Sequence, residues 1–319
     1  MLSLAPLFHG KTHGPPVIAG DQEKQDLTPL QITEQHIKVE DETDTVISLL
    51  TRHCQLPVGE LKQAISKGAL WLTRGKHTQR LRRVKKPLKA QDELHFYYNP
   101  KVLAQEVAPA ILISDLGDYS IWYKPYGMLS QGSKWSDHCT ISRWAQSHLK
   151  PERPVFIVHR LDRAATGLIL LAHSKKAARA LSAMFEQHAL EKHYQIIVHG
   201  DHSQYQQPQV ITEPVEGKSA KSTFSCLSYH QALDLSLVDV KIDSGRKHQI
   251  RRHAAAVNLP VVADRLHGDS ERVYPDSLNL QLCAVSLEFT CPLSGEARIF
   301  ELPQEYRPHL DAVAKQLTE

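Results

Sequence analysis

The sequence lacks the features that indicate a secreted, disulfide-bonded or membrane-spanning protein. It has five cysteines in 319 residues, none of which lies in a C-x-x-C pair. This pattern is typical of a reduced cytosolic protein rather than of a disulfide framework or a zinc ribbon. No apolar run approaches the roughly 20 residues that cross a bilayer. Residues 1–16 do not combine a basic start with a long apolar core, so we expect no secretory signal and a cytoplasmic location.

The chain also lacks a strong net charge. Its 38 Lys and Arg residues and 35 Asp and Glu residues leave a formal net charge of +3. Affinity for an anionic polymer would therefore depend on where the charges lie. The hydrophobic fraction of 41% and the charged fraction of 23% are typical of a soluble globular protein, and the length allows two domains.

Several catalytic and nucleotide-binding motifs are missing. The sequence contains no H-E-x-x-H and no G-x-S-x-G motif. Six residues separate Gly68 from Gly75 and no Ser or Thr follows Lys76, so this segment resembles a P-loop only superficially. His248 and His253 are one position off the spacing that lets two helical histidines share a metal, and we expect no metal site.

The N-terminal third divides into an arm and a small domain. Residues 1–40 have mixed polarity with scattered prolines and glycines, which predicts an arm with little regular structure. We assign residues 41–100 to a small domain. The spacing of its apolar residues predicts two helices, at 45–54 and 58–67, and two strands, at 70–72 and 91–98.

The most basic run of the chain lies between those two strands and contains no acidic residue. Such a run is most often only a solvated face, but this density in a compact unit favours contact with a phosphate backbone. The predicted RNA-binding residues of the run are Arg74, Lys76, Arg80, Arg82, Arg83, Lys85 and Lys86, and Lys89 ends it.

A carboxylate lies in a short polar linker between two apolar runs, 155–158 and 167–172. Asp162 is that carboxylate, and Arg160 and Arg163 flank it. Loops between strands are where rigid scaffolds usually present chemistry. The alternative interpretation is a loop aspartate that caps a turn or pairs with an arginine.

The remaining segments predict alternating strands and helices. Ser174 is a good N-cap for a helix over 174–190. A strand carries Tyr194 on its core side, and another over 233–242 shows a phase shift at Leu237-Val238 that indicates a bulge. A helix is predicted over 246–257 and the last strands over 280–284 and 287–289, whereas 264–278 shows no periodicity.

Three segments, taken in order, resemble the signature of the RluA family of pseudouridine synthases. They are V-H-R-L-D-R-A-A-T-G-L at 158–168, E-K-H-Y-Q-I-I-V-H-G at 191–200 and G-R-K-H-Q-I-R at 245–251. The family pattern is approximately H-R-L-D-x-x-T-S/A-G-L, K-x-Y-x-A-x-V-x-G and G-R-x-H-Q-I-R-x-H. Residues 124–127 resemble its K-P-x-G element. Residues 214–224 resemble D-G-K-x-A-x-T, with Glu216 in place of Asp.

The resemblance implies a fold, an activity and a partner. The fold is α+β, with a mixed, mostly antiparallel sheet in a catalytic domain over 110–319. The helix-helix-turn-strand order of 41–100 resembles the alpha-L RNA-binding domain of ribosomal protein S-four, which precedes the catalytic domain in many of these synthases. The implied activity is isomerisation of uridine to pseudouridine in RNA, without cofactor or metal. We expect an RNA partner, no membrane association and a monomer.

The resemblance also implies roles for four residues. Asp162 is the ionised carboxylate near the ribose, which either attacks carbon 1′ or removes the proton at carbon 2′. Arg251 pairs with it, as a charge in a partly dry pocket requires. Tyr194 stacks on the base and assists loss of the proton from carbon 5. Arg160 fills the gap left by the flipped nucleotide.

Each residue has a plainer interpretation, and so has the chain. Tyr194 alone is a core tyrosine, Arg251 a surface ion pair and Arg160 an ordinary salt bridge. A non-catalytic RNA-binding or ribosome-assembly factor requires no such carboxylate near RNA. A hydrolase with Asp162 as nucleophile lacks a second acid. The basic domain favours large-subunit ribosomal RNA as substrate, with transfer RNA as the alternative.

The sequence departs from the family pattern at a few positions. Ala165 stands in place of Thr and Thr166 in place of Ser or Ala. Cys283 stands where the family often has His, and Ala263-Asp264 where it often has Gly-Asp. None of these replaces Asp162, Tyr194 or Arg251, so we expect effects on the margin of the pocket and on the substrate.

Overall fold

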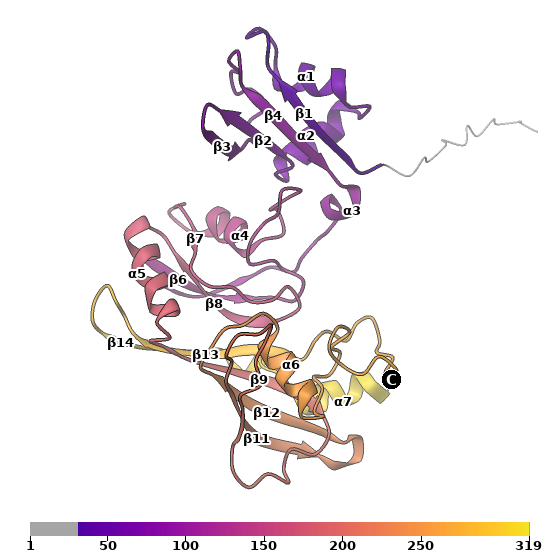
Figure 1. Ribbon diagram of the computed structural model, residues 1–319, viewed down its shortest axis with the longest axis vertical. Helices are drawn as coiled ribbons and strands as arrows, with labels where there is room; N and C mark the ends of the chain where they lie inside the picture. Colours follow the sequence, from indigo (N-terminus) through magenta and orange to yellow (C-terminus); the bar gives the residue numbers. More distant parts are fainter. Residues whose placement is uncertain (1–30, 319) are drawn as a thin grey trace, which may run out of the picture. The chain divides into compact units, whose positions relative to one another are not determined.

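The computed structural model describes residues 31–318 and contains two β-sheets, each with its own hydrophobic core (Figure 1). The first sheet has four strands and the second has ten. Most of the predicted arm, residues 1–30, lies outside the described residues. Within the described residues, no helix is both long enough and apolar enough to cross a membrane.

The four-stranded sheet is covered on one face by two helices (Figure 1). Its strands, in spatial order, are β1 (Thr33–Lys38), β4 (Glu93–Tyr98), β2 (Leu70–Arg74) and β3 (His77–Arg80). The helices α1 (Val46–His53) and α2 (Val58–Ser66) confirm the two predicted helices. Thr45 caps α1, because its side chain accepts a hydrogen bond from the Ser48 amide while the Ser48 hydroxyl accepts one from the Thr45 amide.

Two strands of this sheet were missed, and both have little buried surface. The prediction of little regular structure in the arm was wrong for Thr33–Lys38, which pairs antiparallel with β4 along its whole length. Ile37 is the one buried side chain of this strand, so its sequence carries almost no alternation. No side chain of β3 is fully buried. Both segments form strands because their backbones pair with a neighbour that has more buried side chains, β4 for β1 and β2 for β3.

The ten-stranded sheet is antiparallel except for one pair, β8 with β13. This arrangement confirms the predicted α+β class with a mixed, mostly antiparallel sheet. The main path runs β10 (Gln209–Ile211), β11 (Ser222–His230), β12 (Leu235–Ile242), β9 (Glu191–His199), β13 (Leu282–Thr290), β8 (Thr166–Ala172), β6 (Tyr119–Lys124) and β5 (Ile111–Asp115). Off this path, β14 (Ala297–Glu301) pairs with β13, and β7 (Phe156–Ile157) pairs with β8.

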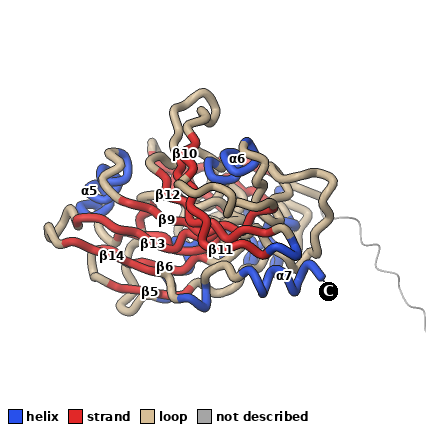
Figure 2. The backbone as a smooth tube through the Cα atoms, turned by 90° about the horizontal axis from the view of Figure 1, so that it is seen from below, coloured by secondary structure: helices blue, strands red, loops and turns tan. Residues whose placement is uncertain are grey.

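Five further helices are α3 (Pro100–Leu103), α4 (Ile141–His148), α5 (Lys175–Glu186), α6 (Gln249–Ala256) and α7 (Leu310–Thr318). Figure 2 shows α6 and α7 on opposite sides of the strands. The packing agrees, because Ile196 lies in the core cluster that contains Ile250 of α6, whereas Ile197 lies in the cluster that contains Val313 of α7. Ser174 caps α5 as predicted, accepting a 3.0 Å hydrogen bond from the Ala177 amide.

Three details of the predicted elements need correction. The two predicted terminal strands are one strand, β13, whose register shifts between Ala284 and Ser286 and so breaks the alternation. The bulge predicted at Leu237-Val238 lies on the neighbouring strand β11, where Leu227 is the extra residue opposite that pair. The helix predicted from residue 246 begins at Gln249, because His248 has a left-handed φ of 57°.

Gly167 allows the one parallel strand pair to form. Its φ is +105°, and a Cβ atom at this position would overlap the backbone of Ala284 in β13. Only glycine therefore lets β8 and β13 come this close. Since β8 begins directly after the polar linker that carries Asp162, this contact fixes where the linker ends.

Candidate active site

Asp162 lies in a linker that neighbouring backbone holds on both sides. The Ser130 hydroxyl donates to the Leu161 carbonyl oxygen at 2.7 Å and accepts from the Leu161 amide at 3.0 Å. The Gly127 amide donates to the Arg163 carbonyl oxygen at 2.9 Å. The K-P-x-G turn at 124–127 and the segment after it therefore brace the residues on either side of Asp162.

Arg251 on α6 faces Asp162, and a second carboxylate holds it in place. The Nη1 atom of Arg251 lies 3.8 Å from Oδ2 of Asp162. Its Nε and Nη2 atoms donate to the two carboxylate oxygens of Asp264, at 2.7 and 2.5 Å. The exposed fractions are 5% for Arg251 and 2% for Asp264. The predicted Asp162–Arg251 pair is present, although Asp264 makes the closer, bidentate contact.

Asp264 stays charged because its environment supplies donors. Burial alone would raise the pKa of its carboxyl group, but hydrogen bonds from Arg251 and from the amides of His267 and Leu266 hold that pKa below its usual value. The preceding residue, Ala263, has a φ of 59°, where the family often has glycine.

Four ionisable groups around Asp162 have shifted pKa values. Burial raises the pKa of Tyr194, and the Asp162 carboxylate adds to that shift, so its phenol is neutral at neutral pH. Burial lowers the pKa of His248, against the opposing effect of Asp162, whose Oδ2 lies 3.8 Å from its Nε2. Burial lowers the pKa of Lys124 to about 7, again against Asp162. Burial also lowers the pKa of Lys192.

A cavity of about 1190 Å³ opens beside this linker and is lined by Arg160, Asp162 and Tyr194 among others. A smaller recess of about 80 Å³ shares these three residues and adds His248 and Gln249. The predicted residues Asp162, Tyr194 and Arg160 thus line both the cavity and the recess, whereas Arg251 lines neither. The large cavity has room for a nucleotide, which agrees with pocket sizes for small ligands.

Two side chains of α6, those of Gln249 and His253, fix the helix to Ser222 at the start of β11. Gln249 donates to the Lys221 carbonyl oxygen and the Ser222 hydroxyl, both at 3.0 Å. His253 lies 2.9 Å from the same hydroxyl through Nδ1 and 2.9 Å from the Glu213 carbonyl oxygen through Nε2. His253 therefore positions the helix and shares no ligand position with His248.

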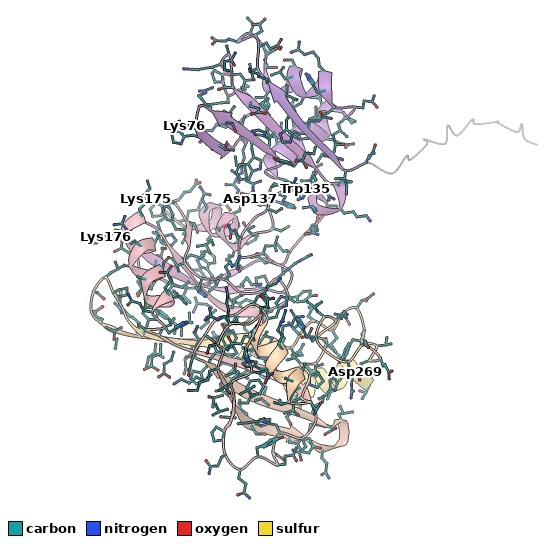
Figure 3. All side chains as sticks on the ribbon, in the orientation of Figure 1. Lys76, Trp135, Asp137, Lys175, Lys176 and Asp269 are labelled. Carbon is teal, nitrogen blue, oxygen red and sulfur yellow. The ribbon has the colours of Figure 1, made fainter. Side chains whose placement is uncertain are left out.

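The basic run separates into two groups. Arg74 donates to Asp92 at 2.8 and 2.6 Å, and both Arg80 and Arg82 form ion pairs with Asp137. These three side chains have acidic partners within the chain. The five basic residues of the run that are exposed are Lys76, Arg83, Lys85, Lys86 and Lys89 (Lys76 is labelled in Figure 3). RNA contact by the run stays a prediction, which these five are placed to carry.

Sequence reasoning missed several residues of the site. Lys124 and Lys192 lie within quoted motifs without an assigned role, and both are buried lysines, an unusual condition that sequence alone does not reveal. His248 was considered only as a metal ligand. Asp264 was noted only as part of a dipeptide, and the signal that could have singled it out was an acidic residue directly after the apolar run at 261–263.

Comparisons with known proteins agree with this geometry. Residues 118–256 match the family described as RNA pseudouridylate synthase. An uncharacterized RNA pseudouridine synthase of Aquifex aeolicus is 31% identical over 231 residues, which cover 64% of this chain and 72% of that protein. A tRNA pseudouridine synthase C of Yersinia pestis is 33% identical over 171 residues, covering 45% of this chain and 66% of that protein.

A solved structure shows the same fold. The human RNA pseudouridylate synthase domain-containing protein 1 superposes with a TM-score of 0.53 at 20% identity, covering 67% of this chain and 98% of that one. At that identity the likeness concerns the fold alone. Taken with the sequence relatives and the signature around Asp162, it establishes that the chain belongs to the RluA-type family of RNA pseudouridine synthases and forms pseudouridine in RNA.

Proposed function

We propose that Asp162, Tyr194 and Arg251 form the catalytic centre and that the substrate is large-subunit ribosomal RNA. The observation that carries the catalytic assignment is the arrangement of Asp162, which faces the same cavity as Tyr194 and lies 3.8 Å from a buried arginine. The location in the cytoplasm and the monomeric state expected from the sequence stay predictions.

In the proposed reaction the bond between carbon 1′ and nitrogen 1 breaks, the uracil rotates, and carbon 5 bonds to carbon 1′. Asp162 either bonds to carbon 1′ or takes the proton from carbon 2′ and later returns it. Over the whole reaction, carbon 5 loses its proton and nitrogen 1, which carried the sugar at the start, gains one. Arg251 balances the charge of the Asp162 carboxylate while Asp264 fixes the orientation of the guanidinium group.

Tyr194 has two separable tasks in this proposal. Its ring stacks on the rotated base, and its hydroxyl assists the loss of the proton from carbon 5. Because burial and Asp162 raise the pKa of Tyr194, the hydroxyl assists through a hydrogen bond rather than as a standing phenolate. Tyr194→Phe should keep RNA affinity and slow the chemical step, whereas Tyr194→Leu should weaken both.

Arg160 is proposed to occupy the space of the flipped nucleotide. It is exposed, lines both the large cavity and the small recess, and follows directly on the strand-like run at 155–158. An extended guanidinium plane at the cavity mouth can stack on the bases that flank the gap. Unstacking a base costs a few kcal/mol, which such stacking partly offsets.

The basic run of the small domain, residues 74–89, supports ribosomal RNA as the substrate through its five exposed cations. We call this segment the basic loop. Transfer RNA is the second candidate, because the Yersinia pestis relative is a tRNA pseudouridine synthase C. The division into a small RNA-binding domain and a catalytic domain remains part of this proposal, as does the likeness of the small domain to the alpha-L module.

The decisive experiment maps pseudouridine in total RNA from cells with and without the gene, by chemical labelling and primer-extension stops. We expect one or a few sites in large-subunit ribosomal RNA to disappear and to return with the wild-type chain but not with Asp162→Asn. Sites lost from transfer RNA instead would establish the second candidate. If no site is lost, purified protein should be tested on both RNA classes, and failure to modify either would overturn the proposal.

A further inference from the structure

Two histidines and a glutamate meet on the exposed face of the four-stranded sheet, away from the site described above. His36 on β1 lies directly opposite His95 on β4, and Glu93 lies two residues before His95. Since strand side chains alternate between faces, these three share one face. Ile37 and Leu94 point to the other face, into the core under α1 and α2.

The two imidazole rings face each other through the same atom. Their Nδ1 atoms lie 2.7 Å apart. The Nε2 atom of His36 lies 3.3 Å from a carboxylate oxygen of Glu34, and that of His95 lies 2.8 Å from the Thr73 hydroxyl. A carboxylate only accepts hydrogen bonds, so it favours a proton on Nε2 of His36 and leaves a lone pair on its Nδ1.

The lone pair of His36 can accept a hydrogen bond from an Nδ1–H of His95, or both Nδ1 lone pairs can bind one metal ion. A carboxylate beside Nε2 of His36 and a hydroxyl beside Nε2 of His95 are partners of the kind that orient metal-bound histidine rings. One ligand atom from each of His36, His95 and Glu93 lies within 4.8 Å of the other two.

The site can adjust to an ion of the size of zinc. Zinc–nitrogen bonds of about 2.0 Å at a tetrahedral angle place two nitrogens about 3.3 Å apart, so the rings would separate by roughly half an ångström. The side chains of His36 and Glu93 are 47% and 46% exposed, which leaves them free to make that shift. The nearby cation Lys134 is paired with Glu34 at 2.6 Å, which limits its repulsion of an ion.

We propose that His36, His95 and Glu93 bind a divalent zinc-class metal ion that links β1 to β4. The ion supplies no step of uridine isomerisation and takes two nitrogens and one carboxylate oxygen from the chain. Its fourth position is left to water. The bound ion would therefore link β1 to the rest of its sheet, which carries the basic loop.

The test is a calorimetric titration of the chelator-stripped full chain with zinc chloride at pH 7.5. We expect one site with a Kd on the order of 10⁻⁶ M or tighter. His36→Gln and His95→Gln should each weaken binding by about 100-fold. His77→Gln is the matched control, because His77 is exposed on β3 of the same sheet and outside the cluster. Circular dichroism should show that all variants are folded.

Two further readouts separate the metal from a shared proton. Zinc should shift the Nδ1 resonances of His36 and His95 in nitrogen-15 spectra of the imidazoles, and it should raise the Tm of the wild type but not that of His95→Gln. Binding should weaken as the pH falls, because protons compete with the ion for the same nitrogens. Equal zinc affinity in the wild type and both cluster variants, or no zinc binding at all, would leave a shared proton only and overturn the proposal.

Discussion

In two regions of this molecule an aspartate binds an arginine through two hydrogen bonds. The two regions differ in what the other guanidinium contacts are. Beside the cavity, Asp264 accepts hydrogen bonds from Nε and Nη2 of Arg251, and the remaining Nη1 faces Asp162. In the basic loop, Asp92 takes Nε and Nη2 of Arg74, and the same Nη2 also donates to the Pro87 carbonyl oxygen. One arginine presents a nitrogen to the site, whereas the other stabilises a loop.

The comparison shows why counting positive charges is a poor guide to where function lies. Asp92 also accepts a hydrogen bond from the Lys89 amide, so the Arg74–Asp92 pair shapes the loop that carries Lys85 and Lys86. The exposed lysines are then the groups available to a phosphate. Beside the cavity, by contrast, one nitrogen of the buried Arg251 lies 3.8 Å from Asp162.

The largest expected effect comes from removing the charge that Arg251 faces. Asp162→Asn should lower the single-turnover rate by at least about 1000-fold, or about 4 kcal/mol, because the amide is neither a comparable nucleophile nor a base. RNA affinity, measured by filter binding, should stay within a few-fold of the wild type. A variant that converts uridine at the wild-type rate would refute the assignment of Asp162.

The next effect tests whether the two aspartate–arginine pairs differ energetically. Asp264→Asn should reduce the free energy of unfolding by about 3–5 kcal/mol, because it leaves the buried Arg251 without its bidentate carboxylate partner and with only the 3.8 Å contact to Asp162. Asp92→Asn is the matched variant. Its partner Arg74 has a 36% exposed side chain that water can solvate, so a loss of only about 1 kcal/mol is expected. Urea unfolding measures both, and equal losses would remove the distinction.

A third test asks whether the cavity wall is as dry as the burial of Arg251 indicates. Burial lowers the pKa of His159 to about 3, and its Nε2 accepts a 2.9 Å hydrogen bond from the Leu170 amide. The unfolded chain takes up a proton at about pH 6.5 and the folded one does not, so this residue costs stability as the pH falls from about 6.5 towards 3.

His159→Gln keeps an acceptor and removes that titration. Its loss of unfolding free energy between pH 7 and pH 4.5 should be about 2–3 kcal/mol smaller than that of the wild type. Urea unfolding at the two pH values provides the measurement. An unchanged pH dependence would mean that His159 is hydrated in the folded protein.

The smallest effect should come from the exposed lysines. Lys85→Gln with Lys86→Gln should weaken RNA binding by about tenfold or less and reduce the slope of log affinity against log salt by about 1 to 2. The control removes two exposed charges from α5, those of Lys175 and Lys176 (labelled in Figure 3), which are not part of the basic run. Equal losses in both double variants would indicate a general charge effect rather than a binding loop.

The sequence predicted those elements in which the order of apolar and polar residues alone shows which side chains are buried. α5 has apolar residues at helical spacing and a serine cap, and β8 is an unbroken apolar run, so both were found from local pattern alone. β1 could not be found this way, because its strand geometry comes from pairing with β4 about sixty residues later. The split of β13 into two predicted strands has a similar origin in a register shift that only its neighbour β9 reveals.

The candidate site divides in the same way. Asp162, Tyr194 and Arg251 lie in motifs and were predicted to act together, and the structure brings Asp162 within reach of Arg251. The partnership of Arg251 with Asp264 and the burial of Lys124 depend on tertiary packing, which no local pattern encodes. The meeting of His36 with His95 was equally invisible, because their spacing follows from strand register.

The Ser130 hydroxyl, which both donates to and accepts from the backbone of Leu161, has a consequence for how substrates are selected. It occupies the two hydrogen-bonding positions that a neighbouring strand would otherwise fill, so the segment before Asp162 is held as firmly as a sheet residue. A rigid segment does not reshape itself around different RNAs. We therefore expect the RNA to deform instead, with uridines that leave their stack at little cost, in loops and bulges, modified in preference to those in stable helices.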